Sequence, residues 1–161
     1  MTAIIRRARA GDEHDILRLV RALATYEREP EAVKATAEGL AALLFGGDPK
    51  VFAHVAEQEE GRIVGVALWF LTFSTWTGRH GIYLEDLFVD PEARGGGIAR
   101  ALFKALADEA RTQDCARLDW GVLDWNELAK GFYRRIGARR MTSWEPWRLD
   151  GDALAALQGD M

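Results

Sequence analysis

An arginine and three consecutive glycines stand where a strand-like segment gives way to a helix-like one. Residues 89–99 read Val-Asp-Pro-Glu-Ala-Arg-Gly-Gly-Gly-Ile-Ala, and Asp90-Pro91 is typical of a turn. The first amides of a helix have no partner inside the helix, and the helix dipole makes that end positive. Glycine lets a backbone come close to a ligand. The segment therefore predicts a loop that binds phosphate groups, with a plain glycine-rich turn as the alternative.

The spacing of the glycines excludes the two commonest phosphate loops. No Lys-Ser or Lys-Thr pair follows them, so the segment is not a Walker loop, and the Gly-x-Gly-x-x-Gly pattern of dinucleotide-binding folds is absent. Arg94 is the natural charge partner for a phosphate, because its guanidinium can pair with two oxygens at once. A solvated surface arginine is the alternative for this residue.

The loop and several other segments resemble one enzyme family. Residues 94–99 match the Arg/Gln-x-x-Gly-x-Gly/Ala loop of the GNAT superfamily of N-acetyltransferases, in which it grips the pyrophosphate of acetyl-CoA. Further segments resemble the diamine (spermidine/spermine) acetyltransferase branch of that family: residues 23–27, 83–89, 124–127, 132–135 and 147–149. The resemblance covers nearly the whole chain in the same order, and it implies an N-acetyltransferase that uses acetyl-CoA.

The resemblance assigns acetyl-CoA binding to three segments. The end of the strand before the loop would pair its backbone with the pantetheine arm, and a backbone N–H there would polarise the thioester carbonyl. The loop would hold the pyrophosphate, and the segment from Asn126 would line the arm, although Asn126 also fits a plain helix N-cap. The predicted residues are Leu87, Phe88, Val89, Arg94, Gly95, Gly96, Gly97, Ile98, Ala99, Arg100, Asn126, Glu127, Leu128, Ala129 and Tyr133.

Two residues are candidates for moving protons. Attack by an amine expels the CoA thiolate, and the resemblance places the phenol of Tyr133 to protonate it; a packed aromatic beside Phe132 is the alternative. An alkylamine is mostly charged at pH 7 and attacks only when neutral, so a base must take its proton. Glu85 is the candidate base, directly or through a water, with an exposed strand carboxylate as the alternative. Strand alternation directs Glu85 and Asp86 to opposite faces unless a bulge intervenes, and the resemblance favours Glu85.

Aromatic and acidic residues elsewhere match positions that hold the acceptor amine in the diamine branch, where they would form a site for a cation. The predicted acceptor-binding residues are Tyr26, Glu27, Glu85, Glu145 and Trp147. Ser74 and Thr75 stand where an acidic residue and a proline are expected, which weakens the case for a long polycation. Ile136 replaces an arginine that helps to bind CoA in the animal enzymes. The implied acceptor is a primary amine of a small molecule: a diamine, a polyamine or a lysine-like amino acid.

The composition of the chain disfavours several classes of binding partner. The net charge of −4 and the isoelectric point near 5.4 disfavour nucleic acid. The longest apolar run, within residues 63–73, falls short of the ~20 residues that a membrane span needs. The single cysteine, Cys115, allows no internal disulfide, and three scattered histidines predict no metal site. We therefore expect a cytoplasmic protein that binds neither nucleic acid nor membrane.

The elements that position these residues alternate along the chain. Strands are expected at residues 3–8, 51–58, 62–73, 82–89, 116–123 and 139–149. Helices are expected after Asp12, at about 36–45, from about 96, from Asn126 to Gly137 and at 151–157. This order predicts one domain, residues 1–161, with a three-layer α/β fold and helices on both faces of a mixed sheet. The resemblance implies that the sheet splays between its fourth and fifth strands and that acetyl-CoA occupies the split.

Other activities stay open at this point. The acceptor is alternatively an amine antibiotic or a protein amino group. A non-catalytic module that senses acetyl-CoA is a further alternative, although a sensor would need neither Tyr133 nor Glu85. The resemblance also implies a homodimer, because similar enzymes complete the acceptor site across a two-fold interface.

Overall fold

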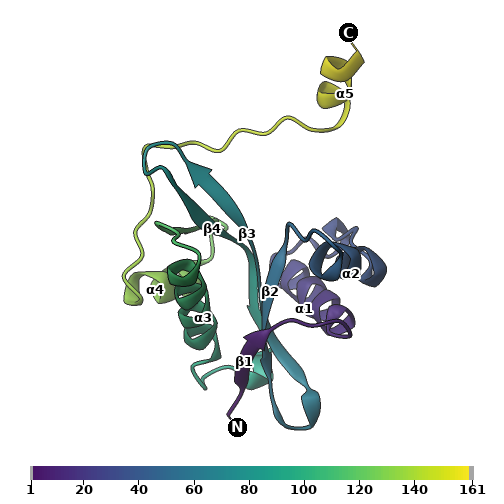
Figure 1. Cartoon of the computed structure of the whole chain (residues 1–161), viewed down its shortest axis with the longest axis vertical. Helices are drawn as coiled ribbons and strands as arrows, with labels where there is room; N and C mark the ends of the chain where they lie inside the picture. Colours follow the sequence, from purple (N-terminus) through teal and green to yellow (C-terminus); the bar gives the residue numbers. More distant parts are fainter. Residues whose placement is uncertain (1, 160–161) are drawn as a thin grey trace. The chain divides into compact units, whose positions relative to one another are not determined.

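The computed structural model describes residues 2–159 and divides the chain into two compact units, Met1–Trp125 and Asn126–Met161. The elements of the first unit (Figure 1) are β1 (Ile4–Arg7), α1 (Glu13–Tyr26), η1 (Pro30–Ala32), α2 (Ala37–Phe45), β2 (Phe52–Glu57), η2 (Glu59–Gly61), β3 (Ile63–Ser74), β4 (Arg79–Val89), η3 (Pro91–Ala93), α3 (Ile98–Thr112) and β5 (Leu118–Trp120). The second unit contains α4 (Glu127–Arg135) and α5 (Gly151–Gly159).

The strands form one mixed sheet in the order β1-β2-β3-β4-β5. Neighbours from β1 to β4 are antiparallel, whereas β4 and β5 run parallel. β5 pairs only with the first half of β4, from Ile82 opposite Leu118 to Leu84 opposite Trp120. β4 then continues to Val89 with no strand on that side among the described residues. The sheet is therefore open beyond Leu84, which confirms the expected separation of the fourth and fifth strands.

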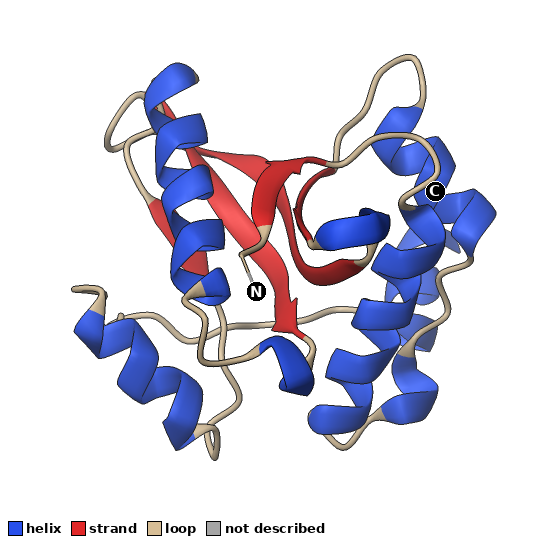
Figure 2. Ribbon diagram, turned by 90° about the horizontal axis from the view of Figure 1, so that it is seen from below, coloured by secondary structure: helices blue, strands red, loops and turns tan. Residues whose placement is uncertain are grey.

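Helices cover both faces of this sheet, as expected for a three-layer fold. Figures 1 and 2 show α1 and α2 on one side and α3 on the other. The side chains of each strand alternate between the two faces, so each face contributes to its own core. The core on the α1 side includes Ile16, Leu19, Leu40, Val55, Val66 and Phe88.

On the opposite face, α3 lies close against β3 because Gly65 has no side chain. A Cβ atom on Gly65 would lie 3.2 Å from the Cβ of Ala56 and 3.2 Å from the Cγ2 of Ile98. Ile98 is the first residue of α3 and is buried. This close packing fixes the start of α3, and thus the helix end that follows the glycine-rich loop.

A partly buried charge network ties β1 to the start of α1. Helix α1 begins after Asp12 as expected, but the Asp12 side chain does not cap the helix. Its carboxylate instead accepts from the N–H of Arg9 at 2.8 Å and pairs with Arg6 at 2.7 Å. Burial alone would raise the pKa of Asp12, but the hydrogen bonds from Arg6 and from the Arg9 backbone lower it below its ordinary value. Arg6 also pairs with Glu57 of β2.

The strand expected at residues 139–149 is the one element that the structure contradicts. Residues 138–150 form neither helix nor strand, and residues 139–150 are exposed. A strand needs a neighbour for its backbone N–H and C=O groups, and the described part of the Asn126–Met161 unit contains no strand that could pair with this segment. The short helix expected after it is α5.

Candidate active site

The glycine-rich loop has the conformation of an anion-binding helix start. Gly97 is the N-cap of α3 with a φ of 77°, and Gly95 has a φ of 87°. Both angles lie in the left-handed region, which favours glycine. The first helical hydrogen bond runs from Ala101 to the Gly97 carbonyl at 2.9 Å. No backbone carbonyl within residues 2–159 accepts from the amides of residues 98–100, so three N–H groups at the positive end of α3 are open to a ligand.

Arg94 folds back over the end of β4. Its Nε donates to the Val89 carbonyl at 3.0 Å, and its guanidinium lies over the rings of Phe88 and Tyr26, 5.4 Å and 5.7 Å from their centroids. Arg94 forms no ion pair with any described residue, and its remaining N–H groups can bind an anion beside the loop. The structure thus brings together predicted site residues from the loop, from β4 and from α1.

The second half of β4 offers backbone groups on its open side. The N–H of Asp90 donates to a carbonyl of β3 at 2.8 Å. Because hydrogen-bonded pairs alternate in an antiparallel ladder, Phe88 and Asp86 bond to β3 in phase with Asp90. Leu87 and Val89 lie between them and direct their N–H groups to the side where β5 has ended. The backbone donors available to a ligand here are therefore those of Leu87 and Val89, whereas the Phe88 amide is used within the sheet.

A β-bulge separates the two adjacent carboxylates of β4. The register with β3 shifts between Leu68, which lies opposite Asp86, and Trp69, which lies opposite Leu84, so Glu85 is the extra residue. Glu85 is exposed, while Asp86 is partly buried on the α1 side of the sheet. The bulge therefore interrupts the alternation that would direct Glu85 and Asp86 to opposite faces, and the two carboxylates differ in their burial.

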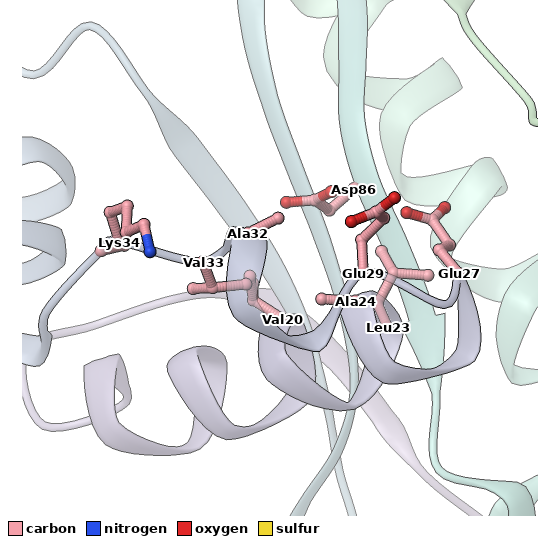
Figure 3. A pocket seen from close by; sticks show the side chains of 10 residues that line it. Val20, Leu23, Ala24, Glu27, Glu29, Ala32, Val33, Lys34 and Asp86 are labelled. Atoms are coloured by element: carbon pink, nitrogen blue, oxygen red, sulfur yellow. The ribbon is translucent and has the colours of Figure 1, made fainter.

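A cavity of about 260 Å³ lies between α1, the segment that follows it and β4 (Figure 3). Its apolar lining comes from Val20, Leu23, Ala24, Ala32, Val33 and Ala35. Its charged lining residues are Glu27, Glu29, Lys34 and Asp86. Figure 3 shows the three carboxylates gathered at one end and Lys34 at the other, beyond Val33. The sequence predicted Glu27 as an acceptor contact and weighed Asp86 against Glu85, with the resemblance in favour of Glu85, but it did not point to Glu29 or Lys34.

Two carboxyl groups at this end of the cavity have raised pKa values. Burial, followed by the negative charges of Glu85 and Glu27, raises the pKa of Asp86 to about 6. Burial also raises the pKa of Glu27. Neither carboxylate has an ion-pair partner in the described part of the chain. A cation bound at this end of the cavity would relieve the repulsion and favour the ionised forms.

The end of α1 holds two of these carboxylates in place. The N–H groups of Arg28 and Glu29 donate to carbonyls in the last turns of α1 at 3.1 Å and 2.9 Å, the two hydrogen bonds of a Schellman motif. Arg28 takes the left-handed position with a φ of 67°, which glycine usually occupies. Its guanidinium lies 4.2 Å from the centroid of the Trp125 ring, a cation–π contact that helps to hold this turn. Glu27 and Glu29 flank Arg28 and therefore have a fixed backbone.

In the second unit, Asn126 caps α4. Its Oδ1 accepts from the N–H of Ala129 at 3.1 Å, which is the alternative role considered for it. Glu127 pairs with Lys130 at 2.9 Å and is exposed, as is Leu128. These contacts define the helix start, and the Asn126 amide N–H₂ group has no hydrogen bond to a described residue.

Tyr133 and the last two predicted acceptor residues also belong to this unit. Tyr133 lies on α4, is partly buried, and meets the ring of Phe132 edge-on with centroids 5.9 Å apart. Glu145 and Trp147 lie in the exposed segment between α4 and α5, and Trp147 is 90% exposed. The structure thus places Tyr133 on a helix, as expected, and the other two on irregular chain.

Comparison with known proteins identifies the family. Residues 14–138 match the model of the Acetyltransferase (GNAT) family. The chain belongs to this family. It is 40% identical over 168 residues to thialysine N-epsilon-acetyltransferase of Sus scrofa, with 98% of each protein covered. It is 35% identical to the human spermidine/spermine N(1)-acetyltransferase-like protein 1, over 90% of this chain and 22% of that protein. An integron cassette protein of V. cholerae has a similar structure, with a TM-score of 0.79, 32% identity and 99% of both chains covered.

The chain is therefore an N-acetyltransferase, and one of its histidines has a structural role. His54 is a structural residue of this acetyltransferase: its Nδ1 accepts from the buried Nε1 of Trp69 at 3.1 Å, and burial lowers the pKa of His54. Residues 2–159 contain no group of three His, Cys, Asp or Glu side chains placed to hold a metal ion. No helix in the same residues has the length and apolarity to cross a membrane.

Proposed function

We propose that this acetyltransferase transfers the acetyl group of acetyl-CoA to a primary amine of a small molecule, by direct attack in a ternary complex. The acceptor class is a diamine, a polyamine or a lysine-like amino acid. The observation that carries the proposal is the cavity beside β4, in which Glu27, Glu29 and Asp86 present three unpaired carboxylates to a ligand. Similarity to acetyltransferases named for thialysine and for spermidine/spermine supports it.

The loop and the open side of β4 fit acetyl-CoA. The amides of residues 98–100 and the guanidinium of Arg94 match the negative oxygens of a pyrophosphate. The amide groups of a pantetheine arm can pair with the backbone of Leu87 and Val89 as an added strand would. A backbone N–H of the same two residues would stabilise the negative oxygen that develops on the thioester carbonyl.

Proton transfer is assigned to two side chains. Asp86 and Glu27 hold the acceptor as an ammonium, and Glu85 takes its proton, directly or through a water. The neutral nitrogen attacks the acetyl carbon, the C–S bond breaks, and Tyr133 protonates the departing thiolate; the second proton that the acetylated nitrogen loses restores the phenol of Tyr133. Cys115 has no place in this scheme, because burial raises the pKa of its thiol and it lies outside the cavity and the loop.

We propose that residues 1–161 act as a single domain. The family match at residues 14–138 runs across the boundary between the two units, which supports this proposal. The donor roles of Asn126, Glu127, Leu128 and Ala129, and the catalytic role of Tyr133, depend on it.

A cytoplasmic homodimer is proposed as the working form. In the segment between α4 and α5, Trp144, Trp147 and Leu149 are 66%, 90% and 50% exposed. Neighbouring apolar side chains that are this exposed favour an interface with another protein, and Glu145 and Trp147 would reach the acceptor site from there. Light scattering should give twice the 18.0 kDa mass of the chain. A monomer at micromolar concentration would exclude the dimer.

The first experiment is acetyl-CoA-dependent release of CoA thiol at pH 8 with putrescine, spermidine, lysine and thialysine. Tyr133→Phe should lower kcat about 100-fold or more, since it removes the acid and keeps the aromatic ring beside the acetyl-CoA arm. Tyr83→Phe is the matched control, because Tyr83 lies in the first half of β4, away from the loop, and its ring is tilted against that of Phe70 with centroids 5.2 Å apart. Tight acetyl-CoA binding without turnover of any of these amines would overturn the small-amine acceptor class in favour of a protein amino group, an amine antibiotic or a sensor. Equal rates for wild type and Tyr133→Phe would remove Tyr133 from the mechanism.

A further inference from the structure

The cavity beside α1 carries opposite charges at its two ends. Glu27, Glu29 and Asp86 form the acidic end, and the ammonium of Lys34 stands at the other (Figure 3). The wall between them is apolar, with Val20 and Ala32 among its residues. The charged groups at the two ends form no ion pair with each other or with another described residue. Their unmatched charges lie along one hollow of the molecule, where a single ligand can meet both.

Lys34 is held in position yet keeps hydrogen-bonding capacity. Its Nζ donates to the carbonyl of Glu31 at 2.9 Å, which uses one of the three ammonium hydrogens. The carbonyl belongs to η1, so the contact directs the side chain toward the turn that borders the cavity. Two N–H bonds remain for a ligand, and a carboxylate is the group that accepts two charged hydrogen bonds best.

The positions of these charges favour the binding of one kind of amine over another. A diamine or polyamine carries a cation at each end, so an ammonium held by Asp86 and Glu27 places a second one near Lys34. Like charges in a binding site lower affinity and thereby create specificity. A molecule with an ammonium, a short methylene chain and a carboxylate meets an opposite charge at each end of the cavity and apolar residues between.

We propose that Lys34 selects amino acids with a side-chain amine over diamines and polyamines, by pairing with the carboxylate of the acceptor. This inference rests on the proposed function, because the amine that reacts is the one held by Asp86 and Glu27 beside β4. Lys34 is then a specificity residue that acts on the far end of the substrate. It takes no part in the chemistry at the thioester.

The test compares acceptors that differ only by the carboxylate: ornithine with putrescine, lysine with cadaverine, and thialysine with its decarboxylated counterpart. Lys34→Met keeps the length of the side chain and removes its charge, and Lys34→Arg keeps the charge. Lys104→Met is the control, since Lys104 lies on α3 and pairs with Asp108 at 2.6 Å on the opposite side of the sheet. Thermal unfolding of each variant verifies that the fold is intact.

Wild type should prefer the amino acid of each pair. Lys34→Met should lower kcat/KM for the amino acid about tenfold or more, through KM, because one charged hydrogen-bond partner is lost. The same variant should leave the diamine unchanged or improve it, while Lys34→Arg and Lys104→Met keep the wild-type preference. An equal effect of Lys34→Met on both members of a pair would overturn the role of Lys34 and leave the proposed function standing. Turnover of no acceptor by wild type would overturn both.

Discussion

Replacing Asp86 with asparagine removes a titrating group from the cavity and keeps nearly the same shape. Burial, and then the charges of Glu85 and Glu27, raises the pKa of Asp86 in the folded protein from 3.8 to about 6. The folded state therefore binds this proton more tightly than the unfolded state. The contribution to stability is fully present below pH 3.8, is lost as the pH rises toward 6, and stays constant above that range.

The size of the effect follows from linkage between protonation and folding. The upward shift corresponds to about 3 kcal/mol of lost stability once Asp86 is ionised in both states. Of this, about 1.3 kcal/mol is lost between pH 5 and pH 7, where folded Asp86 changes from mostly protonated to mostly ionised. Asparagine has no such loss. The free energy of unfolding of Asp86→Asn minus that of wild type should therefore increase by about 1.3 kcal/mol over this interval.

Urea unfolding followed by circular dichroism at pH 5, 6, 7 and 8 measures this difference at constant ionic strength. Subtracting wild type from the variant cancels the groups that do not interact with Asp86, including His54, whose pKa burial lowers. Asp48→Asn, at the exposed Asp48–Lys50 pair, is the control for the loss of one negative charge. A difference for Asp86→Asn that stays constant from pH 5 to pH 7 would refute the burial of this carboxylate among like charges.

Two glycine substitutions test the other parts of the site. Gly97→Ala should lower the free energy of unfolding by about 1 kcal/mol, because the φ of 77° at this position disfavours a Cβ even where space is open. It should also weaken acetyl-CoA binding by distorting the first turn of α3. Urea unfolding and calorimetric titration measure the two effects, and an unchanged affinity would contradict the role of the loop. Gly65→Val should lower the free energy of unfolding by about 1–3 kcal/mol, because its Cβ would already lie 3.2 Å from side-chain atoms of both Ala56 and Ile98. A stability equal to that of wild type would contradict the close packing of α3 on β3.

The local features of the fold were readable from the sequence because they depend on neighbouring residues. Apolar spacing and end signals gave the helices, including the cap at Asn126, where the side chain and the helix amide lie three residues apart. The loop was predicted from glycines that the structure places at positive φ. The strand at residues 139–149 was predicted wrongly, since its apolar pattern carries no information on whether a partner strand exists.

The cavity was beyond prediction for a related reason. Asp86 and Lys34 lie about fifty residues apart in the sequence and meet the same hollow only through the packing of α1 on β4. The bulge at Glu85 is defined by the pairing of β4 with β3, so the sequence of β4 alone could not tell which carboxylate faces inward. The residue types predicted an acidic acceptor site, whereas the place of Asp86 in the cavity became visible only in the three-dimensional structure.

The open side of β4 has a consequence for how the sequence can vary. Leu87 and Val89 offer a ligand only their amide groups, and nineteen of the twenty amino acids supply the same N–H; proline alone does not. Substitutions at these two positions are therefore limited by how well the new side chain fits in the sheet, and hardly at all by the reaction. Gly95 and Gly97 allow far fewer substitutions, because their positive φ angles disfavour most other amino acids. A saturation scan of this acetyltransferase would thus mark the loop as essential and pass over the strand beside which we propose that the reaction takes place.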